Sequence, residues 1–178
     1  PDKPLAVMYG NLSQIMEHYQ PNDLEVKLLK IPAAPIVLLN KQPQLTLSKN
    51  IAPGNPRIGV MLAYTPLHHL LLKKLNKPMV TTSGNLAGEP ICIDNIDVLT
   101  RLQNIADGFL VHDRLIVCPV DDSVVQIVAG KPLFLRRARG YAPQPITLPK
   151  HTQETLLAVG GHYKNTVAIA KYNQAYIS

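Results

Sequence analysis

The sequence has no tryptophan, two phenylalanines and two cysteines among its 178 residues. So few cysteines exclude the disulfide framework that holds small secreted domains together. We therefore expect Cys92 and Cys118 to be reduced, mostly buried thiols in a cytoplasmic protein. Because there is neither a CxxC nor an HExxH motif, we also expect no zinc site within this chain. An aromatic content of 5% is lower than a stacking surface for single-stranded nucleic acid uses.

Long apolar runs are also missing. No run reaches the roughly 18 residues that cross a membrane, so we expect no contact with a membrane, and no signal peptide is recognised. Hydrophobic residues still make up 46% of the chain, which excludes the disordered, coiled-coil and collagen-like classes. The length fits one domain, or one domain and a piece of another. Because the chain begins at Pro1 rather than Met, we expect a piece of a longer protein.

The chain has fewer acidic than basic residues. Eighteen basic and 12 acidic residues give a formal net charge of +6. This balance admits anionic ligands such as nucleotides, phosphates or RNA. The alternative is that the charge serves solubility alone.

Helix and strand signals alternate along the chain, which predicts an α/β fold. Asn11, Thr65 and Asp94 are suited to cap helices, and Pro66 stands at a first helical position. A hairpin around residues 129–132 makes the sheet mixed rather than purely parallel. Strands are predicted at 4–8, 34–39, 58–63, 79–82, 109–111, 124–128 and 133–137, and helices at 11–19, 24–30, 66–75 and 95–107.

A change of character occurs near residue 149. Residues 141–153 contain three prolines and are predicted to be a linker. Three short strands, at 156–159, 165–170 and 175–177, are then predicted to form a meander. A meander of about 25 residues cannot bury a core of its own, so we predict that it opens a second domain.

A polar loop follows the strand predicted at 79–82. Residues 81–85, with the sequence TTSGN, offer three hydroxyls, an amide and a glycine that lets backbone N–H groups approach a ligand. Such turns bind phosphate or carboxylate groups, and ligands of α/β sheets sit beyond the carboxyl ends of strands. The alternative is an ordinary polar turn.

The densest basic cluster closes the predicted hairpin. It contains Arg136, Arg137 and Arg139, followed by Gly140, with Lys131 nearby. Guanidinium groups bind phosphate oxygens in a bidentate manner, so we favour ligand binding. The alternative is a charged edge strand that resists aggregation.

Two sets of residues have the chemistry of metal ligands. Asp121 and Asp122, followed by Ser123, could hold Mg²⁺ against nucleotide phosphates; equally, they could hold the neighbouring arginines or cap a turn, which we favour slightly. His68 and His69 are adjacent on a predicted helix and point about 100° apart. They cannot form an i,i+4 metal pair, so we favour a partly buried histidine.

Seven segments together resemble one known family. They are PDKPLAVM, YTPLHHLLL, TTSGNLAGEPI, IADGFLVHDR, DDSVV, LRRARGYAP and AVGGHYKNT, in this order. The chain resembles the HypF carbamoyltransferase family of nickel-iron hydrogenase maturation over nearly its whole length. The arginine-rich segment followed by the last segment is specific. The SGN loop alone is similar to the broader YrdC-like group, which includes the threonylcarbamoyl-AMP synthases of tRNA modification.

The resemblance implies a division of the chain. Residues 1–148 resemble a YrdC-like domain without its first strand, a twisted mixed sheet with flanking helices. Residues 149–178 resemble a linker and the truncated β-meander that opens a carbamoyl-transfer domain with an actin-like ATPase fold. The other domains of the family would lie outside this chain.

The resemblance also implies an activity. ATP with Mg²⁺ and carbamate, derived from carbamoyl phosphate, would give carbamoyl-adenylate and pyrophosphate. The carbamoyl group would then pass to the C-terminal cysteine of the partner HypE, for the cyanide ligands of the hydrogenase. The alternatives are a threonylcarbamoyl-AMP synthase and a non-catalytic RNA-binding module. For this chain alone we expect nucleotide binding with little or no turnover.

The resemblance also implies, at the positions that match the family's motifs, which residues contact the nucleotide and the carbamoyl-adenylate. Departures from the family pattern occur at Cys118 and Pro119, at Gln126 where an arginine is expected, and at His162 and Tyr163. The implied contacts are Lys3, Thr82, Ser83, Asn85, Asp121, Asp122, Ser123, Arg136, Arg137, Arg139 and Lys164.

Overall fold

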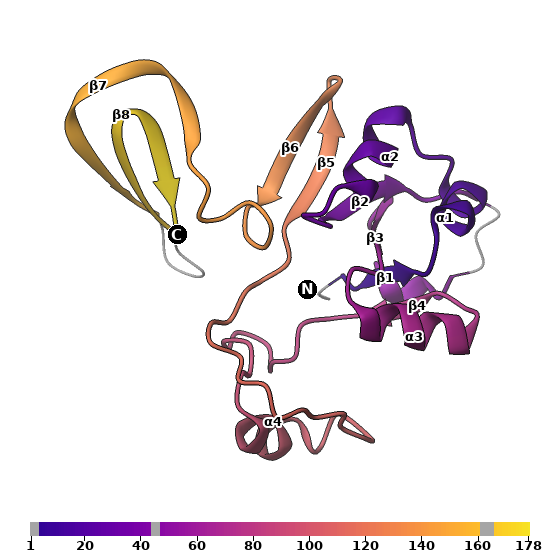
Figure 1. Ribbon diagram of the computed structural model, residues 1–178. Coiled ribbons are helices and arrows are strands. Elements are labelled where there is room, and N and C mark those ends of the chain that lie inside the picture. Colours follow the sequence, from indigo (N-terminus) through magenta and orange to yellow (C-terminus); the bar gives the residue numbers. More distant parts are fainter. Residues whose placement is uncertain (1–3, 44–46, 161–165) are drawn as a thin grey trace.

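Six strands form one mixed sheet, in the order β4-β1-β3-β2-β5-β6 (Figure 1). The computed structural model describes residues 4–43, 47–160 and 166–178. β1 runs parallel to β3 and β2 parallel to β5, while the other neighbours are antiparallel. The predicted mixed α/β architecture is therefore confirmed. The strands are β1 (Ala6–Tyr9), β2 (Ile36–Asn40), β3 (Arg57–Leu62), β4 (Met79–Thr81), β5 (Val124–Val128) and β6 (Lys131–Arg136).

The helices begin where the capping residues predicted them to begin. The side chains of Asn11, Thr65 and Asp94 each accept a backbone N–H of the first turn. The helix predicted to reach residue 107 ends at Leu102. Within the described ranges, no helix has the length and apolar character needed to cross a membrane. The helices are α1 (Leu12–Tyr19), α2 (Asp23–Lys30), the 3₁₀ turn η1 (Lys49–Ile51), α3 (Pro66–Leu75) and α4 (Asn95–Leu102).

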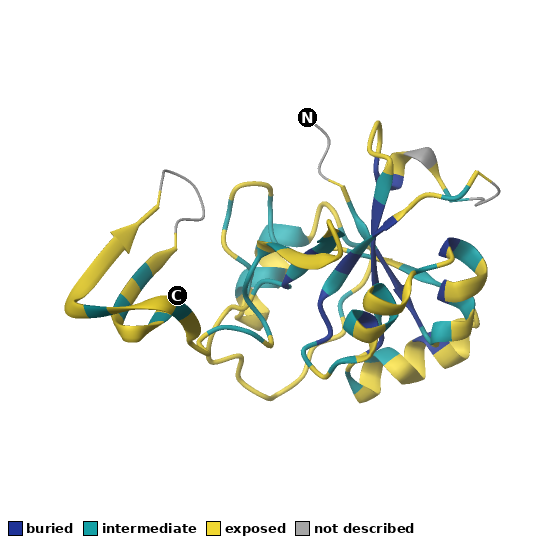
Figure 2. Ribbon diagram, turned by 90° about the horizontal axis from the view of Figure 1, so that it is seen from above, coloured by how far each residue is buried: buried dark blue, intermediate teal, exposed yellow. Residues whose placement is uncertain are grey.

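The two faces of the sheet are covered unequally. Side chains alternate along each strand, and one set packs beneath α1 and α2 to form the main core. The opposite set meets only α3, in a small cluster of Met8, Met61, Ala63 and Leu72. Buried residues accordingly concentrate in the sheet (Figure 2), and the centre of its second face remains open for a ligand.

The β5–β6 hairpin has the predicted position and a two-residue loop. Val128 pairs with Lys131, and the loop residues Ala129 and Gly130 have φ values of 48° and 73°. Positive φ at both positions is the type I′ geometry that matches the twist of the strands. Pro132 lacks an N–H, which an edge strand such as β6 tolerates.

Residues 82–123 leave the sheet and carry α4 away from it (Figure 1). The strand predicted at 109–111 is wrong, because this segment has no strand beside it. It runs past α4 instead, where Asn95 donates its side-chain amide to the His112 carbonyl at 3.0 Å. Cys118 in this excursion is exposed, so burial of both thiols was also a wrong expectation; both cysteines are free.

A separate two-stranded sheet ends the chain. β7 (Ile146–Val159) pairs antiparallel with β8 (Val167–Ile177). The predicted linker and three-stranded meander are therefore wrong in detail, because residues 146–155 belong to β7. Pro149 is accommodated since it falls where the pairing skips from Thr147 to Thr152. The strands are mostly exposed (Figure 2), and a lone two-stranded sheet is at best marginally stable.

Gly140 lies where the chain after β6 returns to the sheet. Its φ is +83°, and a Cβ added there would stand 2.6 Å from Cα and Cβ of Ala33. Gly88 also has a φ of +83° but nothing within 4 Å of an added Cβ. Comparing substitutions at these two glycines therefore distinguishes the cost of a left-handed backbone from the cost of the close contact with Ala33.

We expect Gly140→Ala to lower the free energy of unfolding by about 2–4 kcal/mol, because the segment must move off Ala33. Gly88→Ala is the matched control, with an expected loss of about 1 kcal/mol from the left-handed backbone alone. Urea denaturation of both variants measures the difference. Equal losses would contradict a tight contact at Gly140.

Candidate functional site

A cavity of about 390 Å³ lies on the open face of the sheet. Its floor is apolar and comes from alternate residues of the central strands, among them Ala6, Leu38 and Gly59. Its walls are polar. An apolar floor with a few converging polar groups is typical of a small-ligand site. The polar or charged wall residues are Tyr64, His68, Thr81, Thr82, Ser83, Asp121, Asp122 and Arg136.

The strand register places these walls at two ends of the cavity. Thr81 pairs with Ala6 at the start of β1, so the hydroxyl loop that follows β4 lies at that end. Ile36 pairs with Val124 at the start of β5, next to the acidic pair that precedes this strand. The start of α3, after β3, lies at this second end too, which we call the charged end.

Three hydroxyl residues of the predicted loop reach the cavity. Thr81, Thr82 and Ser83 line it. Asn85 does not, because its side-chain amide donates to the carbonyls of Leu86 and Glu89, each at 2.8 Å. The structure therefore uses Asn85 to hold the shape of the loop.

The three predicted arginines have different surroundings. Arg136 lines the cavity, with its Nη1 atom 3.4 Å from Oδ1 of Asp121. Arg137 donates to the Gln144 carbonyl at 2.8 Å and is not part of the cavity wall. Arg139 is fixed within the fold, so the predicted basic cluster separates into one cavity arginine and two others.

Arg139 makes several contacts at once. It donates to the carbonyls of Ala33 and Ala34 at 3.0 and 2.8 Å. It also donates to Oδ1 of Asp122 through Nη2 and Nε, at 2.8 and 3.2 Å. Its guanidinium carbon lies 3.9 Å from the centroid of the Tyr64 ring. These contacts join the segment before β2 to the charged end of the cavity.

Both aspartates line the cavity and each pairs with an arginine, Asp121 with Arg136 and Asp122 with Arg139. This is the structural arrangement that the sequence slightly favoured. Ser123 is fully buried; its hydroxyl donates to the Arg139 carbonyl at 2.9 Å and accepts the Ala138 N–H at 2.8 Å. Ser123 therefore supports the wall without lining it.

Some predicted positions remain outside this geometry. Lys3 and Lys164, together with the departures His162 and Tyr163, lie outside the described residues. Gln126, where an arginine was expected, accepts a hydrogen bond from Nη1 of Arg57. Among the described residues, no group of three or more His, Cys, Asp or Glu side chains is arranged to hold a metal ion.

Comparison with known proteins identifies the family. Residues 1–138 match the Sua5/YciO/YrdC family, described as "Telomere recombination". The chain belongs to this YrdC-like family. It is also 86% identical over its whole length to the Synechocystis carbamoyltransferase HypF, of which it covers 23%. It is 43% identical over 99% of its length to HypF of Rhizobium leguminosarum, of which it covers 24%.

Solved structures agree with this assignment. A full-length HypF in a phosphate- and nucleotide-bound form matches with a TM-score of 0.91 and 46% identity, over 99% of this chain and 28% of that one. The Sua5 protein of P. abyssi, complexed with L-threonine, matches with a TM-score of 0.64 and 17% identity, over 77% of this chain and 40% of that one. The second likeness shows the fold alone. The YrdC-like chain therefore spans about a quarter of the HypF relatives that it matches.

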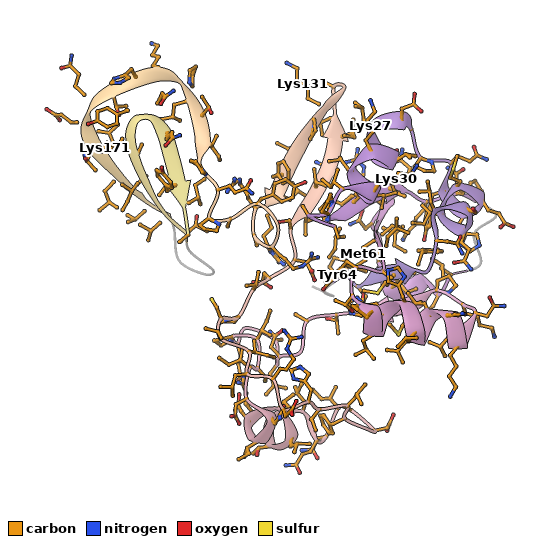
Figure 3. All side chains as sticks on the ribbon, viewed as in Figure 1. Lys27, Lys30, Met61, Tyr64, Lys131 and Lys171 are labelled. Atoms are coloured by element: carbon orange, nitrogen blue, oxygen red, sulfur yellow. The ribbon has the colours of Figure 1, made fainter. Side chains whose placement is uncertain are left out.

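Two wall residues of this YrdC-like site were missing from the predicted contacts. Tyr64 and His68 flank the start of α3, and their rings meet edge to face with centroids 4.6 Å apart. Figure 3 shows Tyr64 beside Met61, near α3. Burial, and then the nearby Arg139, hold the pKa of His68 below its usual range. The available signal was an aromatic residue directly before the Thr65-Pro66 helix start and a histidine in the first turn that follows.

We expect Arg139→Ala to lower the free energy of unfolding by about 2–4 kcal/mol, because it leaves two carbonyls and Asp122 without their donor. Arg136→Ala removes the same group from a half-exposed site with one long ion pair and should cost about 1 kcal/mol or less. Urea denaturation compares the variants. A larger loss for Arg136→Ala would contradict these roles.

The lowered pKa of His68 predicts a pH dependence of stability. The unfolded chain takes up its proton first as the pH falls below about 6.5, so protonation favours unfolding until the lower folded-state pKa is passed. The groups facing this ring are Tyr64, His69, Asp122 and Arg139. Between about pH 7.5 and about pH 5.5, we expect His68→Asn to lose less unfolding free energy than the unsubstituted chain. His69→Asn, which changes the exposed neighbour, should lose as much unfolding free energy as the unsubstituted chain. If the unsubstituted chain and both variants have identical pH profiles, His68 does not contribute to the pH dependence of stability.

Proposed function

We propose that this chain is the adenylate-forming part of a HypF-type carbamoyltransferase. It would bind ATP and carbamate derived from carbamoyl phosphate, and join them as carbamoyl-adenylate. The observation that carries this proposal is a cavity lined by Thr82, Ser83 and Arg136 in a chain 86% identical throughout to a carbamoyltransferase HypF. The phosphate- and nucleotide-bound form of a related HypF supports nucleotide binding.

The proposed reaction needs positioning more than covalent catalysis. A carbamate oxygen attacks the α-phosphorus of ATP, the bond between this phosphorus and the α–β bridging oxygen breaks, and pyrophosphate leaves with the electron pair. No proton has to move in this step. The protein accelerates it by aligning the two reactants and by neutralising phosphate charge.

The described residues divide this work between the two ends of the cavity. Thr82 and Ser83 offer hydroxyls at one end, and Arg136 offers a guanidinium fork at the other. Mg²⁺ bound to the phosphates would find carboxylate oxygens at Asp121 and Asp122. Arg139 acts indirectly, by fixing Asp122 and Tyr64. Asn85 and Ser123 support the walls, and Arg137 lies away from them.

The remaining expectations are part of the same proposal. Residues 1–148 form the adenylate-forming domain, and residues 149–178 open a carbamoyl-transfer domain that passes the group to HypE in hydrogenase maturation, in the cytoplasm. Lys3 and Lys164 complete the phosphate contacts. The relatives at 86% and 43% identity are HypF carbamoyltransferases, whereas the likeness to Sua5 is at 17%. These identities favour carbamoyl transfer over threonylcarbamoyl-AMP synthesis.

Calorimetric titration of ATP into the 178-residue chain tests the proposal. We expect binding in the micromolar to low millimolar range, weakened at least about tenfold by Arg136→Ala through loss of a charge-assisted contact. Lys131→Ala is the matched control, since Lys131 lies at the far tip of the same strand (Figure 3). Pyrophosphate release by this chain alone should be slight.

Two other results, one from RNA binding and one from the titration of the variants, would contradict this assignment. Salt-dependent binding of RNA without binding of ATP would favour the RNA-binding alternative. Equal weakening by Arg136→Ala and Lys131→Ala would show a general effect of charge and remove Arg136 from the site.

A further inference from the structure

One buried polar atom of the cavity wall has no role in the reaction as described. Within the described ranges, four buried side-chain atoms lack a hydrogen-bond partner: Nδ1 of His68, Oδ1 of Asn85, Nη1 of Arg137 and the Tyr141 hydroxyl. Of these residues, His68 alone lines the cavity. Leaving a buried polar atom unpaired is unfavourable, because the atom loses its bond to water and gains none in return. A ligand in the cavity would supply the missing partner.

The backbone and the ring of His68 each make a contact at the start of α3. The His68 backbone N–H donates to Oγ1 of Thr65 at 3.2 Å, at the capped start of α3. The ring stands nearly perpendicular to that of Tyr64, at an interplanar angle of 85°. Tyr64 in turn carries the Arg139 guanidinium on its ring. His68 is therefore held at the charged end by contacts that lead back to β2.

The charge state of His68 favours an acceptor. Burial lowers its pKa, the cation of Arg139 and the neighbouring His69 lower it further, and the carboxylate of Asp122 opposes them. The ring is thus neutral near pH 7. A neutral imidazole has one nitrogen that donates and one that accepts.

The proposed substrate offers a matching donor. Carbamate has a carboxylate, which attacks the α-phosphorus, and an amino group with two N–H donors. The apolar floor offers this amino group only weak acceptors, such as the thioethers of Met8 and Met61. The carboxylates of Asp121 and Asp122 accept from arginines through Oδ1, and a carboxylate can accept further bonds. Nδ1 of His68 differs from them in being a buried wall atom without a partner.

We propose that Nδ1 of His68 accepts a hydrogen bond from the amino group of the carbamoyl moiety. This inference rests on the proposed function and extends it to substrate choice. A methyl group in place of the amino group would leave the buried nitrogen unpaired, and sites that hydrogen-bond a substrate N–H reject analogues that lack it. His68 is thereby the residue that selects a carbamoyl over an acetyl group.

Two non-hydrolysable adenylate analogues test this choice. 5′-O-[N-(carbamoyl)sulfamoyl]adenosine and 5′-O-[N-(acetyl)sulfamoyl]adenosine differ only in an amino or a methyl group. We expect the 178-residue chain to bind the carbamoyl analogue at least about tenfold more tightly. His68→Ala should reduce this preference to about twofold or less, while ATP binding persists.

Matched variants separate a hydrogen bond from a structural effect. His68→Asn places an amide near the position of Nδ1 and should keep most of the preference, whereas His68→Gln places it near Nε2 and should not. His69→Ala, one residue along the same helix, should change nothing. In ¹⁵N spectra of the imidazole, Nδ1 of His68 should shift with the carbamoyl analogue and not with the acetyl one.

The outcomes distinguish this inference from the proposed function. If both analogues and ATP bind but His68→Ala keeps the full preference, the role of His68 is overturned and adenylate formation stands. If neither ATP nor either analogue binds, the proposed function is overturned and this inference with it.

Discussion

The Arg139 guanidinium holds together three segments that are far apart in the sequence. It reaches the carbonyls of Ala33 and Ala34 before β2, Asp122 before β5 and the Tyr64 ring before α3. An arginine presents five donors in a rigid fork, which suits a junction of this kind. These contacts add to the pairing of Ile36 with Val124 and to the bond from the Ile36 N–H to the Ser123 carbonyl, which also join the charged end of the cavity to its floor. A residue outside the cavity wall therefore helps to position the site.

The cavity exists because α3 covers only part of the second face of the sheet. The alternation of side chains buries one set beneath α1 and α2, and the opposite set meets α3 alone. Gly59 has no side chain at the centre of this second face, where an added Cβ would stand 2.8 Å from Cγ2 of Ile36. The same pleat therefore supplies a stable core on one side and a recess on the other.

The sequence correctly predicted the features that depend on local contacts, namely the helix starts and the hairpin. The capping side chains placed the helix starts. The hairpin was predicted from the turn residues at 129–132, and its loop is shorter than predicted, because Lys131 and Pro132 already pair with β5. The strand expected at 109–111 failed for a non-local reason, since an apolar triplet becomes a strand only beside a partner. Pro149 was taken as a mark of a linker, but the pairing of β7 with β8 skips over it.

The candidate site shows the same limit. From the sequence, Arg136, Arg137 and Arg139 were predicted to share one role, because their side chains are chemically identical. Their roles separate only through contacts such as that of Arg139 with Ala33, 106 residues away. Tyr64 and His68 were missed as contacts because a helix start carries no sign of the cavity beside it. The hydroxyl loop and the acidic pair were found, since each directly adjoins a strand end.

The departure at Gln126 lies on the face of the sheet that carries the cavity. The resemblance leads to an arginine at this position of β5. In the structure, Arg57 on β3 reaches across the intervening β2 and donates to the Gln126 side chain. Residues 57, 59 and 61 share one face of β3, and Gly59 and Met61 line the cavity. The Arg57 guanidinium therefore lies on the cavity face of the sheet, beside Gln126.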